Sequence, residues 1–405
     1  MLSFAHTALT YVMPTLFVLT LIVTVHEFGH FFVARCFGVA VDEFSLGFGR
    51  ALLRWKDKAG VEWRLGWIPL GGYVRFSGDE NAASVPDRES LDELRRQIIA
   101  TEGVQAVGRY YHFKPIWQRA AIAAAGPVAN FVLAIVLFAA LLMTVGAPTP
   151  PARVGKVAPA SPAFAAGFQP NDVVVVAAGK SVSSFQALQK IVSARAGLST
   201  DFTVQRGANR VDLVATPAIG VFQDEIGLKK SGGMLGLYSG PTPADLTPHR
   251  RGLIPALAGG AGMTLDVLGG TLETIEGIVT GQISPSELGG PIGIAQASHA
   301  VVTSGAAGGK TLDQKLLGGM VGLLGLSGVV SVGIGFMNLL PIPILDGGHL
   351  LFYAYEAVAR RPVDGAVQAL SYRVGLALLL GLMLFATTND LQRGRVFHFL
   401  GGPFS

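Results

Sequence analysis

Four long apolar stretches alternate with more polar segments along the chain. A helix needs about 20 mostly apolar residues to cross the hydrocarbon core of a bilayer. The stretches therefore predict membrane-spanning helices over residues 9–34, 119–146, 321–350 and 372–389. The whole pattern predicts an α-helical polytopic membrane protein with about four transmembrane helices and extramembrane segments between them.

The loop between the first two predicted spans, residues 35–118, contains a different pattern. Apolar and polar residues alternate over about residues 41–76, around the sequence KDKAG, and this predicts a membrane-associated β-hairpin. Lys and Arg are enriched in cytoplasmic loops. Such residues flank this loop and the loop between the last two spans, at Arg35, Lys114, Arg119, Arg360, Arg361 and Arg373. Both loops are therefore expected in the cytoplasm, and both chain ends on the opposite side.

The region between the second and third spans is longer and more polar. It predicts an inserted extramembrane domain over residues 150–235 and a connector over residues 236–320. Within the connector, residues 254–283 are apolar enough to resemble a fifth span. Their acidic residues are Asp266, Glu273 and Glu276. That spacing suits an amphipathic helix lying on the membrane interface, so we predict a peripheral helix here.

The amino-acid composition limits the classes of molecule that this protein is expected to bind. Half of the 405 residues are hydrophobic and 14% are charged, which agrees with a membrane protein. The net charge is only +4 and the basic residues are scattered, so no nucleic-acid partner is expected. The single cysteine, Cys36, excludes an internal disulfide, and we interpret it as a small apolar filler.

The first predicted span contains three polar residues, His26, Glu27 and His30, in the sequence VTVHEFGHFF. Residues four apart share one face of a helix, so the two imidazoles point the same way. This HExxH pattern is typical of a zinc site whose glutamate takes a proton from water. The alternative is burial for packing alone, which leaves a carboxylate at bilayer depth at a cost of about 3 kcal/mol. The metal interpretation is therefore preferred.

A catalytic zinc usually has three protein ligands, so one more is needed. The sequence NLLPIPILDGGH, residues 338–349, interrupts the third predicted span with Pro341 and Pro343. Broken backbone at membrane depth occurs where it lines a cavity or is buried in protein. Asp346 and His349 both lie there, and their spacing leaves either one open as the third ligand. With four spans, the first and third run in the same direction, which brings both half-sites to the cytoplasmic leaflet.

These motifs together resemble the RseP-type site-2 proteases, intramembrane zinc metalloproteases of peptidase family M50, over most of the chain. The resemblance implies Zn²⁺ as the cofactor. The residues it implies for the site are His26, His30 and Asp346 as zinc ligands, Glu27 as general base and Asn338 as a group that holds the substrate backbone. It makes His349 a bystander.

Two further stretches resemble family segments next to the second and third spans. They are FKPIWQRAAIAAAGPVANFVLA, residues 113–134, and SELGGPIGIAQ, residues 286–296. Neither predicts chemistry by itself. Gly126, Pro127 and Asn130 in the first stretch are interpreted as residues that allow close helix packing.

The inserted domain contains SPAFAAGFQPNDVVVVAAGKSVSSFQAL, residues 161–188, which resembles bacterial PDZ domains, with Asn171 where glycine is commoner. One clear copy is present, as in single-PDZ members of the family. PDZ domains bind extended peptides by strand addition. Such binding and steric exclusion of bulky substrates both stay open as roles. The edge of the predicted hairpin could likewise pair with a substrate helix that has been unwound.

The expected function is that of a zinc-dependent intramembrane endopeptidase in the bacterial inner membrane, with its site near the cytoplasm and a periplasmic PDZ domain. The resemblance implies single-span substrates already trimmed outside the membrane, such as anti-sigma factors or signal-peptide remnants, and the lipid bilayer as surroundings. One alternative is a zinc or ion transporter, since polar residues on broken membrane helices also mark transport sites. The other is a catalytically silent PDZ scaffold.

Overall fold

The structure is a computed structural model that describes residues 2–78, 88–146, 150–223, 229–245 and 247–393. The chain divides into two compact units. The helical unit comprises Met1–Ala139, Leu257–Gly269 and Pro285–Ser405, and the strand-rich unit comprises Ala140–Ala256 and Gly270–Ser284.

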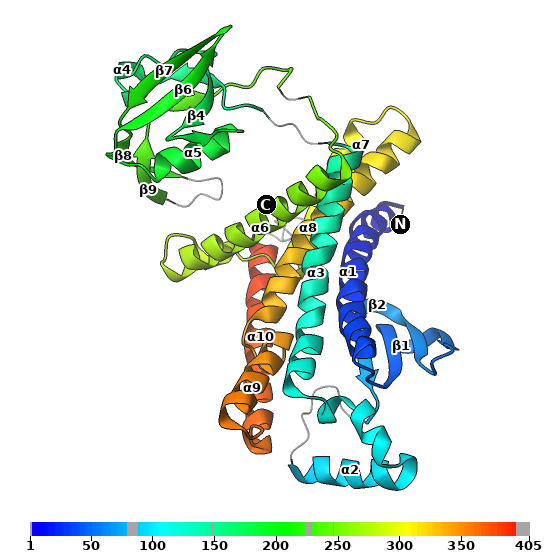
Figure 1. Ribbon diagram of the computed structural model, residues 1–405. Coiled ribbons are helices and arrows are strands. Elements are labelled where there is room, and N and C mark those ends of the chain that lie inside the picture. The colour runs from blue at the N-terminus through cyan, green and yellow to red at the C-terminus, as the bar shows by residue number, and fades with distance from the viewer. Residues whose placement is uncertain (1, 79–87, 147–149, 224–228, 246, 394–405) are drawn as a thin grey trace. The chain divides into compact units, whose positions relative to one another are not determined.

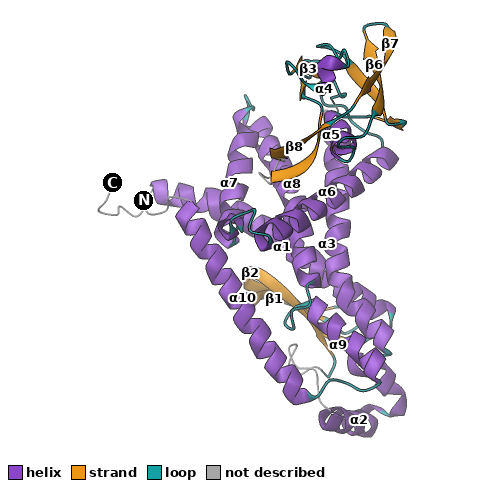
Figure 2. Ribbon diagram, turned by 90° about the vertical axis from the view of Figure 1, so that its left-hand side faces the viewer, coloured by secondary structure: helices purple, strands orange, loops and turns teal. Residues whose placement is uncertain are grey.

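Long helices dominate the helical unit (Figures 1 and 2). The longest are α1 (Leu2–Cys36), α3 (Ile116–Thr144, which continues into the other unit), α8 (Leu312–Leu339) and α10 (Gly365–Arg393). The shorter ones are α2 (Arg88–Glu102), α7 (Pro291–Ala307), α9 (Asp346–Ala359) and the 3-10 turns η1 (Val104–Arg109), η2 (Tyr111–Phe113) and η3 (Pro285–Glu287).

Helices α1, α3 and α8 pack with alternating directions. His26 of α1 approaches Asn130 of α3, and one turn later His30 approaches Ile122, so these two helices are antiparallel. On α8, the Ser331 hydroxyl donates to the Asn130 carbonyl at 2.9 Å, whereas the earlier residue Gly328 faces the later α3 residue Phe138. Helix α8 is therefore also antiparallel to α3, and α1 and α8 run in the same direction.

Among the residues that the structure describes, five helices are long and apolar enough to cross a membrane, judged by length and composition. Four of them overlap the predicted spans: Thr10–Cys36, Ile116–Thr144, Leu312–Leu339 and Gly365–Gln392. The fifth is α6 (Leu253–Val279), which the sequence predicts to be peripheral. Its mean hydropathy of 1.3 is the lowest of the five, against 1.8 to 2.3 for the others. The chain is a polytopic membrane protein, and the number of spans stays a prediction.

The hairpin predicted for the first loop is present, but its strands bend. Strands β1 (Val41–Lys56) and β2 (Glu62–Phe76) pair antiparallel, and residues 43–46 lie beside both 72–75 and 62–65. Glycines permit both bends, because Gly47 and Gly49 in β1 adopt φ of 81° and 86° and Gly71 in β2 adopts φ of 87°, values that other residues rarely adopt. Phe44 and Val61 are buried at the centre of the resulting small sheet.

The helix of the third predicted span ends just before Pro341 and Pro343. Helix α8 stops at Leu339, residues 340–345 form turns, and α9 starts at Asp346. The turn is tight, since a Cβ at Gly347 would lie 2.2 Å from the Leu340 carbonyl oxygen. Only glycine fits this position without moving the backbone. The predicted break in the helix is confirmed, and it places Asp346 at a helix start.

The strand-rich unit has its own core. Its main sheet has the order β5-β4-β6-β7, formed by Lys180–Ser181, Val173–Ala177, Thr200–Arg206 and Asn209–Ala215. Two smaller pairs are β10 (Leu237–Ser239) with β3 (Val154–Val157), and β8 (Ala218–Gln223) with β9 (Lys229–Met234). Helices α4 (Pro162–Ala165) and α5 (Phe185–Ser193) complete the unit. Phe202 and Val204 are buried at its centre, against Leu188 of α5.

Candidate metal centre

Helix α1 brings the two histidines of the HExxH motif together, as their spacing predicts. The Nε2 atoms of His26 and His30 lie 3.2 Å apart, and the ring planes are nearly perpendicular. His26 is buried and His30 is half-buried. Both rings therefore present one nitrogen to the same small volume, where water has little access.

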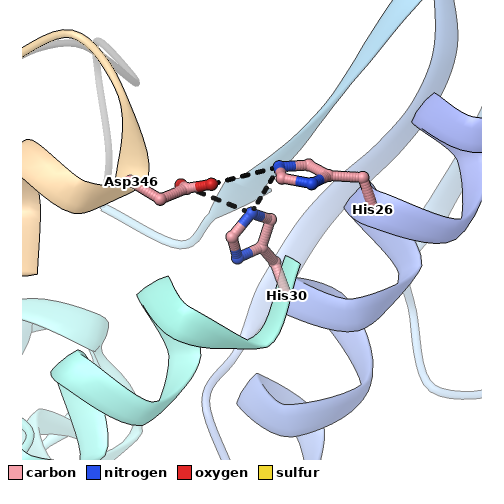
Figure 3. A group of neighbouring side chains, drawn as sticks. All are labelled: His26, His30 and Asp346. Carbon is pink, nitrogen blue, oxygen red and sulfur yellow. Dashed lines mark hydrogen bonds and ion pairs between the residues drawn. The ribbon is translucent and has the colours of Figure 1, made fainter. Parts of the chain in front are cut away.

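The third member comes from α9. The Oδ2 atom of Asp346 lies 3.1 Å from His26 Nε2, and its Oδ1 lies 3.5 Å from His30 Nε2 (Figure 3). The three potential ligand atoms all lie within 4.8 Å of one another. Asp346 is the first residue of α9, and a carboxylate is favoured at a helix N-terminus by the helix dipole. Two neutral imidazoles and a carboxylate form a donor set that suits zinc.

Helix α3 fixes the orientation of His30. The Nδ1 atom of His30 lies 2.8 Å from the Ile122 carbonyl oxygen, which can only accept a hydrogen bond. Nδ1 therefore carries the proton, and Nε2 keeps the lone pair that a metal needs. Gly126 packs directly over the rings, because a Cβ there would lie 2.3 Å from His30 Nε2. The prediction that Gly126 allows close packing is confirmed, and the side chains that it packs against are those of His26 and His30.

A cavity of about 210 Å³ opens beside this group. Glu27 lines it, as do Tyr73 and Val74 of β2. Strand β2 passes close to the glutamate, since a Cβ at Gly72 would lie 3.0 Å from the Cγ atom of Glu27. The general-base candidate thus lies between the metal centre and one strand of the sheet.

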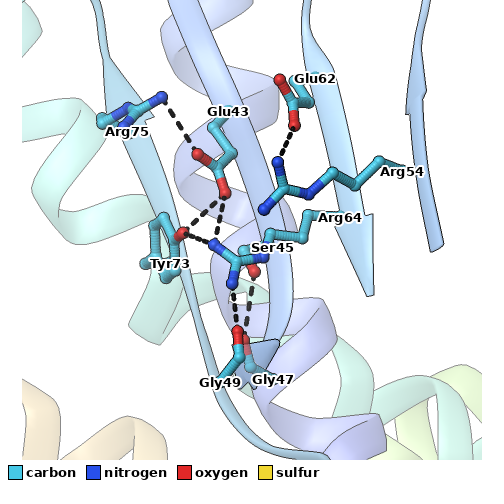
Figure 4. A network of polar contacts seen from close by, with 9 residues as sticks. All are labelled: Glu43, Ser45, Gly47, Gly49, Arg54, Glu62, Arg64, Tyr73 and Arg75. Carbon is cyan, nitrogen blue, oxygen red and sulfur yellow. Dashed lines mark hydrogen bonds and ion pairs between the residues drawn. The ribbon is translucent and has the colours of Figure 1, made fainter. Parts of the chain in front are cut away.

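A polar network holds that strand in place (Figure 4). Tyr73 donates to Glu43 Oε1 at 2.6 Å, Arg64 donates to the same oxygen at 3.3 Å, and Arg75 lies 3.0 Å from Oε2. Burial opposes ionisation of Glu43, but these partners outweigh it and hold the pKa of the carboxyl below its ordinary value of 4.5. Burial and the Glu43 charge raise the pKa of Tyr73. The network therefore ties the cavity-lining part of β2 to β1.

The remaining site candidates lie apart from the three ligand atoms. His349 lines the cavity, and its ring lies 6.4 Å from that of Tyr353, but it does not belong to the three-residue group. Asn338 lies half-buried in the last turn of α8, and the described lining of the cavity does not include it. Its assignment stays a prediction.

Two groups near the site were not predicted from the sequence. The buried side chain of Asn130 meets His26, with Nδ2 3.3 Å from Nδ1. Arg119 of α3 pairs with Glu356 of α9 at 2.8 Å and lies over the Tyr353 ring, which links the helices that carry the site. Long-range pairs of this kind leave no periodic signal in the sequence.

The fold and site define a membrane metalloenzyme with an HExxH helix. Comparison with known proteins gives the family: the model of peptidase family M50 matches residues 14–382, so the chain belongs to that family. The predicted family is confirmed.

Curated relatives agree over nearly the whole chain. Metalloprotease MmpA of Caulobacter vibrioides is 48% identical over 393 residues, 96% of this chain and 97% of the relative. "Putative zinc metalloprotease Atu1380" of Agrobacterium fabrum is 38% identical, covering 94% and 96%. A Rickettsia conorii relative with the same description, RC0203, is 32% identical, covering 92% and 96%. The chain is therefore a metalloprotease whose cofactor is zinc, as predicted.

Proposed function

We propose that this metalloprotease is an intramembrane endopeptidase of the site-2 type, with zinc held by His26, His30 and Asp346. The observation that carries the proposal is the convergence of three ligand atoms within 4.8 Å, two from one helix of membrane length and one from the start of α9. A hydrolytic centre so placed acts on peptide bonds within or near transmembrane segments. A transporter would not require a glutamate directly beside the first ligand.

Glu27 is the proposed general base. When bound, zinc acidifies water and polarises the scissile carbonyl. Glu27 lines the same cavity, follows His26 in the chain and is half-buried, so its carboxylate can accept a proton there and deliver it to the leaving amine. The close approach of Gly72 limits the room for the glutamate side chain to turn away.

Strand β2 is proposed to bind the substrate in an extended conformation, by strand addition. A transmembrane helix satisfies its own backbone hydrogen bonds, so it must be unwound before a carbonyl can be attacked. Residues 72–75 pair with β1, and Tyr73, Val74 and Phe76 line the cavity. An extended substrate added along this strand would place its backbone beside the metal centre. Asn338 is proposed, from the family resemblance alone, to hold the same backbone.

The directions of the helices support a peripheral α6. Helices α1 and α8 run the same way and α3 runs opposite, so the chain leaves α3 and enters α8 at the same end of the bundle. A crossing by α6 would need a second crossing before α8. The intervening α7 has only 17 residues, short for a span. We therefore propose four spans and a metal site near the cytoplasmic side.

The membrane, the role of the strand-rich unit and the substrates are proposed from the directions of the helices and from the family resemblance. The membrane is the bacterial inner membrane, and the strand-rich unit is a single periplasmic PDZ domain that binds or sterically filters substrates. The substrates are single-span proteins already trimmed outside the membrane, such as anti-sigma factors or signal-peptide remnants, cleaved in regulated intramembrane proteolysis.

The Glu27→Gln variant tests the mechanism. Purified protein in lipid nanodiscs is given a single-span reporter, and both cleavage and zinc content are measured. We expect zinc to stay bound and cleavage to fall by at least about a hundredfold, because the side chain can no longer accept the proton. The exposed Glu276→Gln serves as the matched control and should cleave normally. Undiminished cleavage by a zinc-loaded Glu27→Gln protein would refute the assigned base.

A further inference from the structure

Asn130 is a fully buried polar side chain in a membrane-length helix. Its exposed fraction is 0%, and Nδ2 lies 3.3 Å from Nδ1 of His26. Its Oδ1 atom is buried and has no hydrogen-bond partner among the residues that the structure describes. Buried side-chain oxygens are rarely left in this way, so the atom calls for an explanation.

The two histidines explain this unpaired oxygen, because their Nδ1 atoms have different partners. His30 is next to the Ile122 carbonyl, which accepts from Nδ1–H and leaves Nε2 free to bind a metal. Within the described part of the chain, no backbone carbonyl is hydrogen-bonded to Nδ1 of His26, and the group in the equivalent place is the amide of Asn130. To offer Nε2 to zinc, a neutral His26 must also carry its proton on Nδ1, and that proton needs an acceptor.

A side-chain amide can meet this need. A half turn about the Cβ–Cγ bond exchanges Oδ1 and Nδ2 while the shape of the side chain is unchanged. After this turn the oxygen faces His26 Nδ1 and accepts a hydrogen bond from Nδ1–H. The oxygen then has a partner, Nδ2 takes the position where the described residues provide none, and both histidines have the same tautomer.

The surroundings hold Asn130 at the level of His26. Its carbonyl accepts from Ser331 of α8 at 2.9 Å, and a Cβ at Gly335 would lie 3.2 Å from the Asn130 Cβ. Helix α8 therefore presses α3 against α1 at this level, so the amide has few other positions. The sequence analysis interpreted Asn130 as a residue that allows close helix packing. That interpretation describes its backbone, and its side-chain amide has a separate role.

We propose that Asn130 is a positioning residue that sets the tautomer of His26, with its amide oxygen accepting from Nδ1–H. This inference rests on the proposed zinc ligation by His26. It adds a neutral acceptor to the site, where a carboxylate would add negative charge beside Asp346 and Glu27.

The test compares Asn130→Leu, which cannot accept a hydrogen bond, with Asn130→Asp, which can only accept. Ser331→Ala is the matched control, since it removes a hydrogen bond to the backbone of Asn130 and leaves the amide intact. For each full-length variant the zinc dissociation constant is measured by competition with a chromophoric chelator. The visible spectrum of the cobalt-substituted protein reports ligand geometry, and thermal unfolding of the metal-stripped protein reports folding.

We expect the leucine variant to bind zinc 10- to 100-fold more weakly, with an altered cobalt spectrum, as for other outer partners of metal-bound histidines. The aspartate variant and the control should stay within about threefold of the unchanged protein, a margin well below that loss. Zinc affinity retained by the leucine variant, or lost equally by the aspartate variant, overturns the proposal. If the leucine variant does not fold, the smaller Asn130→Ala, which also lacks an acceptor, takes its place in the comparison. Failure of the unchanged protein to bind one zinc would instead refute the ligand set.

Discussion

Replacing Gly126 by alanine tests the geometry of the site most directly. The added Cβ would lie 2.3 Å from His30 Nε2 and 2.8 Å from His26 Cε1. Non-bonded heavy atoms prefer about 3.5 Å or more, so the rings and α3 must separate by roughly 1 Å. Alanine cannot avoid this contact by changing rotamer, because its Cβ is fixed by the backbone.

The effect on stability is expected to be small. Overpacking costs about 1–3 kcal/mol, but the higher helix propensity of alanine returns about 1 kcal/mol. The net loss is therefore between about 0 and 2 kcal/mol, which a folded membrane protein can tolerate. Catalysis should respond far more, because a displacement of about 1 Å at an active site can reduce the rate about a hundredfold.

The assay measures zinc content, thermal unfolding and reporter cleavage for Gly126→Ala and for Gly262→Ala. Gly262 is also helical, but nothing lies within 4 Å of its Cβ position, so this control should cleave normally and unfold at the same or a higher temperature. A Gly126→Ala protein with normal zinc content and normal cleavage would show that α3 does not contact the rings as described.

Four further substitutions have definite expected outcomes. Asp346→Asn should lower zinc content, whereas His349→Ala should leave it nearly unchanged, and the reverse result would exchange their roles. Asp245→Asn should destabilise the strand-rich unit at neutral pH, because the hydrogen-bonded Arg153 holds the pKa of Asp245 below its ordinary value of 3.8. That stabilisation is present above the unfolded pKa and is lost as pH falls below it, so unfolding curves of the two proteins should converge in acid. Asp390→Ala should cost about 1–3 kcal/mol in unfolding measurements, since this buried carboxylate accepts from two backbone N–H groups at the start of α7, at 2.9 and 2.8 Å. Equal stability of this variant and the unchanged protein would contradict that assignment.

Local rules predicted those parts of the molecule that depend on neighbours in the chain. The i, i+4 spacing of His26 and His30 placed both rings on one face, and Pro341 and Pro343 predicted an interruption of the third span, which the structure has after Leu339. Alternation over residues 41–76 predicted paired strands. In each case the deciding interactions lie within a few residues or across one turn.

Other features depend on packing between distant segments, which periodicity does not encode. The bends at Gly47 and Gly49 give β1 two sets of partners, where a simple hairpin has one. The contact between Asn130 and His26 joins residues more than a hundred positions apart, and the sequence shows only an asparagine in an apolar helix. The choice between Asp346 and His349 came from family resemblance, because three residues of separation could not decide it.

The ligand candidates lie at opposite ends of the synthesis of this chain. His26 and His30 leave the ribosome early, but Asp346 emerges only after most of the remaining sequence has been made. Until α9 has folded back against α1, the two imidazoles lack the carboxylate that completes the proposed zinc site. A chain whose synthesis has not reached residue 346 therefore lacks one of the three proposed zinc ligands.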